Sequence, residues 1–308
     1  MTDIYGRRGN QPISWFHRKS VLGNQYCPYC GVFLGAGSEV KSNKEHLIGR
    51  EFVPSGSLGA TGFNFHFRVC CRCNVEKSDA EGLISSITLF NTPARFNDPQ
   101  LNSLAKRKAA GAYHPDEKDT LVKDASANRL VEFGNNAFQV RCNLTSPPRL
   151  PARLVSLLAY KHIQGLFSLI TSSDPREKTR LLPHENIHVF DYYNYLDWGN
   201  TQLAEVNARV RSWPCYANIC AAEGYFRALL RRCVDSQVGW FWALEWNRSL
   251  RVIGVIAQPR LIPQLFRDLP ELHWTPFPDG SCRFREEVRM PEEQDTLFDA
   301  EVVGFTGS

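Results

Sequence analysis

The chain has 308 residues, of which 43% are hydrophobic and 22% are charged, and this composition is typical of a globular protein with room for two domains rather than a disordered or fibrous one. No apolar stretch reaches the length of a membrane span and the polar start MTDIYGRRGN is unlike a signal peptide, so we expect a cytoplasmic protein with no membrane partner. Residues 1–150 contain 19 Lys and Arg against 13 Asp and Glu, whereas residues 151–308 contain 17 against 19. We therefore expect the first half to contact a polyanion such as DNA.

Two CxxC pairs occur early in the chain, Cys27 with Cys30 and Cys70 with Cys73. Two residues between cysteines allow both thiolates to bind one ion, so two such pairs complete a tetrahedral zinc site. Four thiolates leave the ion no open position, which predicts a structural zinc. The alternatives are four buried or redox-active thiols, or Cys71 as a ligand in place of Cys70, although only Cys70 keeps the two-residue spacing.

The segment between the pairs predicts a hairpin, and a helix is predicted after it. Residues 45–48 (EHLI) and 63–69 (FNFHFRV) are expected to be strands, joined by the glycine-rich residues 49–62. Apolar and polar side chains alternate in the second strand, which predicts one buried face and leaves Asn64, His66 and Arg68 on the other. The helix is expected to begin at Asn74 and to reach about Leu89.

The rest of the chain divides at a group of prolines near residues 147–151. Residues 96–150 are polar and predict a basic connecting segment. Periodicity beyond it predicts helices at 152–171 and 201–213 and strands at 224–232, 239–246 and 250–257, the last two forming a hairpin. These elements predict an α+β domain over residues 151–290. Its expected role is recognition, regulation, or contact with a partner protein or a second copy of the chain. An acidic, mobile tail is expected at 291–308.

In this order, the segments CPYCG, KEHLI and VCCRCNVEK resemble the HNH, or ββα-metal, endonucleases, and in particular the zinc-framed branch that includes endonuclease VII and the McrA-type nucleases. The resemblance covers roughly residues 25–90 and implies that residues 1–95 form an HNH nuclease domain. It implies that the four cysteines hold zinc, that Glu45 and Asn74 hold a catalytic Mg²⁺ or Mn²⁺, and that His46 activates water.

This chain departs from the family in two places. The residue before the histidine is more often aspartate than glutamate. The central asparagine of the family usually lies just before the second cysteine pair, where this chain has both Asn64 and His66, and either of these is expected to orient His46. Asn74 also has an alternative role, because asparagine is favoured as a helix N-cap.

The activity that the resemblance implies is metal-assisted hydrolysis of DNA phosphodiester bonds, in restriction or phage defence. A divalent ion bound by a carboxylate and an amide oxygen stabilises charge on the phosphate, and a neutral imidazole accepts a proton from water. Arg68 and Lys77 are expected to contact flanking phosphates. The alternative is a zinc-dependent nucleic-acid-binding protein that does not cleave, in which Glu45 and His46 are incidental.

A second motif, His184-Glu185-Asn186-Ile187-His188, matches the HExxH pattern of zinc peptidases. That pattern needs a helix to bring both histidines to one ion. Pro183 before the motif and the β-branched and aromatic residues after it favour a loop that enters a strand, where residues four apart lie about 13 Å from each other. The sequence therefore disfavours a peptidase.

Overall fold

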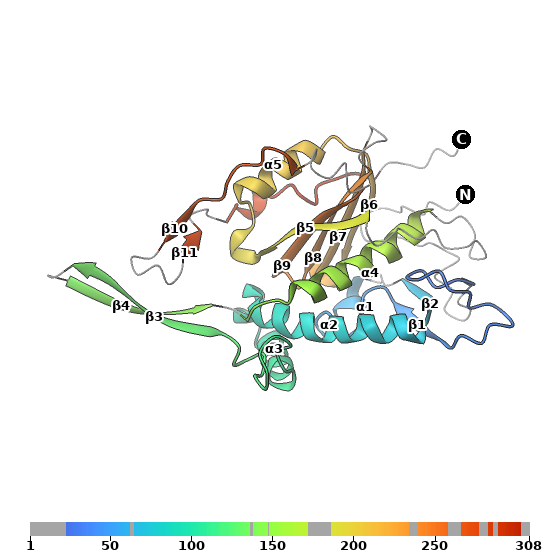
Figure 1. Ribbon diagram of the computed structural model, residues 1–308, viewed down its shortest axis with the longest axis horizontal. Coiled ribbons are helices and arrows are strands. Elements are labelled where there is room, and N and C mark those ends of the chain that lie inside the picture. Colours follow the sequence, from blue (N-terminus) through green and yellow to red (C-terminus); the bar gives the residue numbers. More distant parts are fainter. Residues whose placement is uncertain are drawn as a thin grey trace.

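The computed structural model describes residues 23–61, 65–135, 138–146, 148–171, 186–233, 239–257, 266–276, 283–285 and 289–302. Helices and strands are mixed, so the fold is α+β as expected (Figure 1). Among these residues, no helix combines the length and apolar character needed to cross a membrane.

The elements of the first half are β1 (Ser42–His46), α1 (Ser57–Thr61), β2 (His66–Cys70), α2 (Cys71–Asn91), a 3-10 helix (Pro93–Phe96), α3 (Pro99–Gly111), β3 (Ala127–Asn135) and β4 (Phe138–Ser146). Those of the second half are α4 (Ala152–Thr171), β5 (Ile187–Asn194), α5 (Thr201–Val210), β6 (Cys215–Ala221), β7 (Phe226–Arg232), β8 (Trp240–Trp246), β9 (Leu250–Ile256), β10 (Trp274–Pro276) and β11 (Arg283–Arg285). Three further 3-10 helices lie at Tyr195–Asp197, Ala222–Gly224 and Glu292–Gln294.

The predicted hairpin is present, although its first strand covers Ser42–His46 rather than residues 45–48. β1 and β2 pair antiparallel, with Ser42 opposite Cys70 and His46 opposite His66. Phe65, Phe67 and Val69 are buried, and the residues between them are half-buried, which confirms the alternation for this part of the strand. Phe63 and Asn64 lie outside the described residues.

Helix α2 begins at Cys71, three residues earlier than predicted, and Cys70 occupies its N-cap. It ends at Asn91, and Thr92 takes an extended conformation with φ −66° and ψ 130°. Pro93 explains this end, because the residue before a proline avoids the helical region. Asn74 is therefore the fourth residue of the helix and does not cap it.

Strands β5 to β9 form one antiparallel sheet in the order β5-β9-β8-β7-β6. The predicted hairpin of β8 and β9 is confirmed, and Asn247 and Arg248 at its turn have φ values of 53° and 51°. Two successive positive φ values are typical of a type I′ turn, whose twist matches that of the strands. Trp242 and Trp246 of β8 are fully buried, so this aromatic segment belongs to the core.

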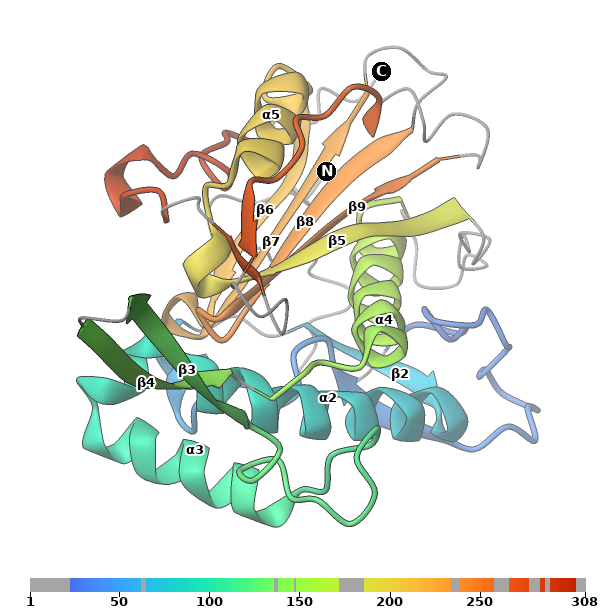
Figure 2. The same cartoon turned by 60° about the vertical axis from the view of Figure 1, so that its left-hand side comes forward.

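One hydrophobic core extends across the two predicted domains. Its members run from Cys27 in the first half to Ile256 in β9. Helix α4, which has the predicted bounds, lies between α2 and the sheet in both ribbon views (Figures 1 and 2). Gly165 allows α4 to pack closely here, because a Cβ at this position would lie 2.7 Å from Leu47 Cδ1. The prolines near residue 150 thus precede a shared helix rather than separate two cores.

The predicted connecting segment and the predicted tail both contain ordered structure. Residues 96–150 include α3 and the hairpin of β3 and β4, which extends from the body of the molecule (Figure 1). In the expected tail, Leu297 and Phe298 are buried in a second core cluster with α5 and the sheet, because these two apolar side chains fill space beside the strands. Residues 303–308 lie outside the described part of the chain.

Asn247 connects the β8–β9 turn to the first half of the chain. It is fully buried, and Nδ2 donates to the carbonyl of Phe52 at 3.0 Å and to Oγ1 of Thr88 at 2.9 Å. Asn247→Gly keeps the positive φ accessible but removes both bonds, so we expect a loss of about 2 kcal/mol in the free energy of unfolding by urea. Arg248→Gly, in the same turn but exposed, should change it by under about 0.5 kcal/mol. Equal losses in the two variants would contradict this role for Asn247.

Candidate metal centre and candidate active site

Four cysteines from two separate segments meet beside the hairpin. The sulfur atoms of Cys27, Cys30, Cys70 and Cys73 all lie within 4.8 Å of one another. Cys30 Sγ and Cys70 Sγ are 3.7 Å apart. Two thiolates bound at about 2.3 Å to one tetrahedral zinc ion lie about 3.8 Å apart. The four cysteines can therefore hold a metal ion such as zinc.

Each pair is positioned by a different local structure. Cys27 and Cys30 lie in a tight turn, where the N–H of Gly31 donates to the carbonyl of Cys27 at 2.8 Å and Gly31 has a φ of 69°. Cys70 ends β2, and Cys73 lies in the first turn of α2. Cys71 is not a member of the group, so the two-residue spacing identifies the correct pair. Hydrogen bonds from Cys27 and then Cys73 lower the pKa of Cys30, so its thiolate is favoured, whereas hydrogen bonds within the group raise the pKa of Cys27 and of Cys73.

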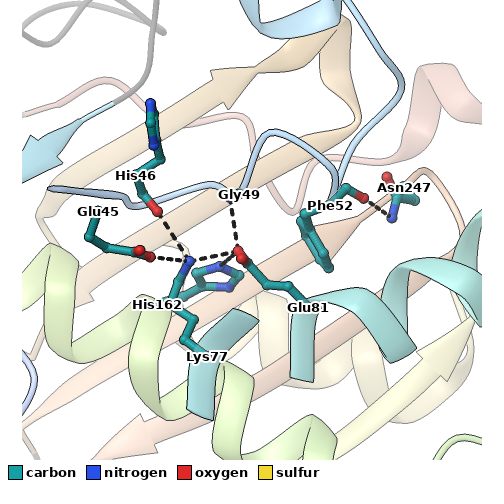
Figure 3. Close-up of polar contacts among 8 residues, drawn as sticks. All are labelled: Glu45, His46, Gly49, Phe52, Lys77, Glu81, His162 and Asn247. Atoms are coloured by element: carbon teal, nitrogen blue, oxygen red, sulfur yellow. Dashed lines mark hydrogen bonds and ion pairs between the residues drawn. The ribbon is translucent and has the colours of Figure 1, made fainter. Parts of the chain in front are cut away.

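Lys77 lies at the centre of a buried charged cluster between β1 and α2 (Figure 3). Its Nζ is 2.7 Å from Oε1 of Glu45 and 2.7 Å from Oε1 of Glu81, and it donates to the carbonyl of His46 at 3.1 Å. An ammonium has three donors, and these three acceptors use all of them. Lys77 is also fully buried. Because it is inaccessible and all three donors are used, the predicted contact with a DNA phosphate does not agree with its position.

Glu45 points from the end of β1 toward α2 (Figure 3). Burial raises the pKa of this carboxyl, and the charge of Lys77 acts in the opposite direction. The position expected to hold a divalent ion is thus next to an ammonium that already neutralises the carboxylate.

Glu81 joins this cluster to α4. Its Oε1 accepts from the N–H of Gly49 at 2.9 Å and lies 3.5 Å from Nε2 of His162. Burial lowers the pKa of His162 to about 4, so this ring is neutral near pH 7. Burial is the largest single effect on Glu81 and acts to raise its pKa, but Lys77 and His162 together outweigh it and the pKa is lowered. Glu81 and His162 are not among the site residues predicted from the sequence, although Lys77 and Glu81 have the i,i+4 spacing of a helical ion pair and His162 interrupts a largely apolar helix.

His46 lies on the other side of β1 from Glu45, since neighbouring residues of a strand point to opposite faces. Its ring points away from Lys77 (Figure 3). The ring of His66 packs edge-on against it, with centroids 4.3 Å apart. Nε2 of His46 is buried and has no hydrogen-bond partner among the described residues. Burial, followed by the charge of Arg50, lowers the pKa of His46 to about 4.

The remaining predicted site residues are positioned as follows. Asn74 is half-buried and lies three residues before Lys77, so it shares the helix face that Glu45 approaches. Arg68 donates from Nη2 to the carbonyl of Leu34 at 2.7 Å and to Oγ of Ser42 at 3.0 Å, which holds its guanidinium against the body of the protein. Asn64 is outside the described residues.

The HExxH motif lies only partly in the described region. Ile187 and His188 begin β5, as the strand interpretation predicted, while His184 and Glu185 lie outside the described residues. Comparisons with protein-family models, curated proteins and solved structures find no match to this chain.

Proposed function

We propose that this chain is an HNH-type endonuclease that hydrolyses phosphodiester bonds of DNA and contains a structural zinc ion bound by its four clustered cysteines. The observation that carries the proposal is the arrangement of the hairpin. The cysteine cluster closes β1 and β2 onto the start of α2. At the end of β1, Glu45 faces that helix and His46 points to the opposite side of the strand (Figure 3). The resemblance of CPYCG, KEHLI and VCCRCNVEK to the family supports the same reading.

His46 is the base in this proposal. The lowered pKa makes its imidazole neutral near pH 7, and Nε2 has no partner among the described residues. A neutral imidazole with an available acceptor nitrogen can take a proton from water once substrate and water enter. His66 is one of the two candidates to orient the ring, because the two imidazoles are in contact.

Glu45 and Asn74 are the proposed protein ligands of the divalent ion. When bound, Mg²⁺ or Mn²⁺ supplies Lewis-acid stabilisation of charge on the phosphate. A carboxylate and an amide oxygen suit such an ion. In the structure, however, Lys77 contacts Oε1 of Glu45, so the two residues do not form an ion site as they lie. The carboxylate must turn away from Lys77 or bind through its second oxygen.

This ion pair favours a second candidate function, a zinc-dependent nucleic-acid-binding protein without cleavage. In that case Glu45 is a structural carboxylate that compensates Lys77, and the hairpin is a zinc-stabilised binding module. The predicted setting in restriction or phage defence rests on the family resemblance alone.

Incubation with supercoiled plasmid DNA tests the proposal. We expect nicked or linear plasmid with Mg²⁺ or Mn²⁺ and intact plasmid without added divalent ion, because the reaction needs charge stabilisation at the phosphate. Zinc content measured in both samples controls for loss of the structural ion. A single ββα-metal site cuts one phosphodiester at a time, so linear product that forms without accumulation of nicked plasmid would indicate two copies acting together. DNA binding without cleavage of any DNA or RNA substrate would support the second candidate.

A further inference from the structure

A pocket of about 500 Å³ lies far from the β1–β2 hairpin, at the junction between the end of α2 and the turns of the large sheet. Pro93 and Ala94 line it from the 3-10 helix after α2, and Arg248 lines it from the β8–β9 turn. This volume is within the range of small-molecule sites. Helix α2 has 21 residues and spans about 30 Å between the cysteine cluster and this pocket.

Four arginines and four acidic residues line the pocket, so their charges balance by number. Its ability to bind an anion therefore depends on which of these side chains are paired with each other. Arg251 is buried and ion-paired, with Nε 2.9 Å from Oε2 of Glu245 and Nη2 in contact with Asp295. Arg227 and Arg289 are half-buried and form no salt bridge among the described residues, although Arg227 lies opposite Glu245 on the neighbouring strand and its charge acts to lower the pKa of that carboxyl. The other two acids, Glu223 and Glu292, are exposed to solvent.

The guanidinium groups of these two arginines lie over aromatic rings. The Cζ atom of Arg289 is 3.9 Å from the ring centroid of Tyr195, and that of Arg227 is 4.4 Å from the centroid of Phe298. Stacking occupies the faces of a guanidinium and leaves its N–H groups pointing outward in the plane. Nε of Arg289 is buried and has no hydrogen-bond partner among the described residues. In the described part of the chain, this donor of Arg289 is therefore available to a ligand.

We propose that this pocket binds the phosphate group of a small molecule of about the size of a mononucleotide. The N–H groups of a planar guanidinium can donate two parallel hydrogen bonds to a phosphate in a bidentate geometry. Arg227 and Arg289 supply these donors, and the aromatic rings beneath them fix their orientation. The pocket lies at the opposite end of α2 from the cysteine cluster, so this ligand is distinct from the nucleic acid proposed for the hairpin.

Calorimetric titration of the full chain tests this site, with ATP, inorganic phosphate, adenosine and a single-stranded oligonucleotide as probes. We expect ATP to bind with a dissociation constant below millimolar, phosphate to bind more weakly, and adenosine not to bind. Arg289→Gln and Arg227→Gln should each weaken ATP binding by about tenfold or more, because each removes a charge-assisted contact. Arg153→Gln, which changes an exposed arginine of α4 outside the pocket, should leave the affinity unchanged.

Glu292→Gln should tighten ATP binding, because it removes the negative charge of an exposed acid from the pocket. A misfolded variant would bind ATP more weakly, so misfolding would not produce this result. Four results would overturn the proposal: no binding of ATP or phosphate at millimolar concentration, equal binding of adenosine and ATP, no effect of the arginine variants, or weaker binding by Glu292→Gln. Arginine-dependent binding of the oligonucleotide without binding of ATP would assign the pocket to nucleic acid instead and would also overturn it. None of these outcomes depends on cleavage.

Discussion

Replacement of Cys70 by serine is expected to remove the bound zinc and to lower the melting temperature by more than about 10 °C, because the binding free energy of a structural zinc ion is part of the folding free energy. The adjacent Cys71→Ser variant is expected to keep both the zinc and the melting temperature. Cys71 is the next residue in the chain, but it is not a member of the cysteine group. Zinc content by elemental analysis and thermal unfolding measure the two effects.

This pair of variants separates a metal site from a group of buried thiols. If the cysteines were only apolar core residues, Cys70→Ser would cost about as much as any buried cysteine and no zinc would be found in the wild-type protein. Loss of zinc from Cys71→Ser with retention in Cys70→Ser would show that the wrong cysteine has been assigned. Chelation of the wild-type protein should reproduce the unfolding of Cys70→Ser.

Lys77→Met is expected to destabilise the protein by about 3–5 kcal/mol near neutral pH, because it leaves the two buried carboxylates of Glu45 and Glu81 without their shared cation. Lys44→Met on the exposed side of β1 is the matched control and should change the free energy of unfolding by under about 0.5 kcal/mol. Chemical denaturation of both variants and of the wild type measures the difference.

The cost of Lys77→Met should depend on pH in a definite direction. Without the ammonium, burial raises the folded-state pKa of both carboxyls above the unfolded value. An acid with a raised folded-state pKa destabilises the fold when the pH is above that pKa, and the penalty disappears as the pH falls and the group becomes protonated. The deficit relative to the wild type should therefore be larger at about pH 8 than at about pH 5. A deficit that is small, or that grows on acidification, would contradict the buried cluster.

The elements that sequence reasoning located depend on patterns within a short stretch of chain. The two-residue spacing of the cysteines, the alternation around Phe67 and the helical period of residues 152–171 each carry their own signal, and the corresponding elements are present. The turn at Asn247 and Arg248 is likewise a local feature. These local patterns do not show which distant segment of the chain packs against each face of a helix or strand.

The features that were not predicted depend on that missing information. Lys77 looked like a surface cation because nothing near it in sequence shows that α4 covers it and adds His162 to the cluster. Leu297 and Phe298 looked like part of a solvated tail because their neighbours are acidic, although the two side chains themselves are buried. In both cases, burial is decided by segments distant in sequence.

The opposite directions of Glu45 and His46 were not foreseen for a similar reason. The resemblance to the HNH family assigns a role to each residue in a motif. It does not predict which side chains of neighbouring elements contact that residue. Here Lys77 engages Glu45, while His46 faces His66 across the hairpin. The nuclease proposal therefore depends most on whether the histidine acts on substrate.

The most direct test is cleavage of plasmid DNA with Mn²⁺ by the wild type, by His46→Ala and by His188→Ala, with DNA binding and zinc content measured for all three. His188, in β5, is the matched control because it belongs to the other histidine motif. We expect His46→Ala to lose cleavage by at least about 100-fold while DNA binding and zinc remain, and His188→Ala to keep all three. Cleavage by His46→Ala at the wild-type rate would contradict the proposed active site.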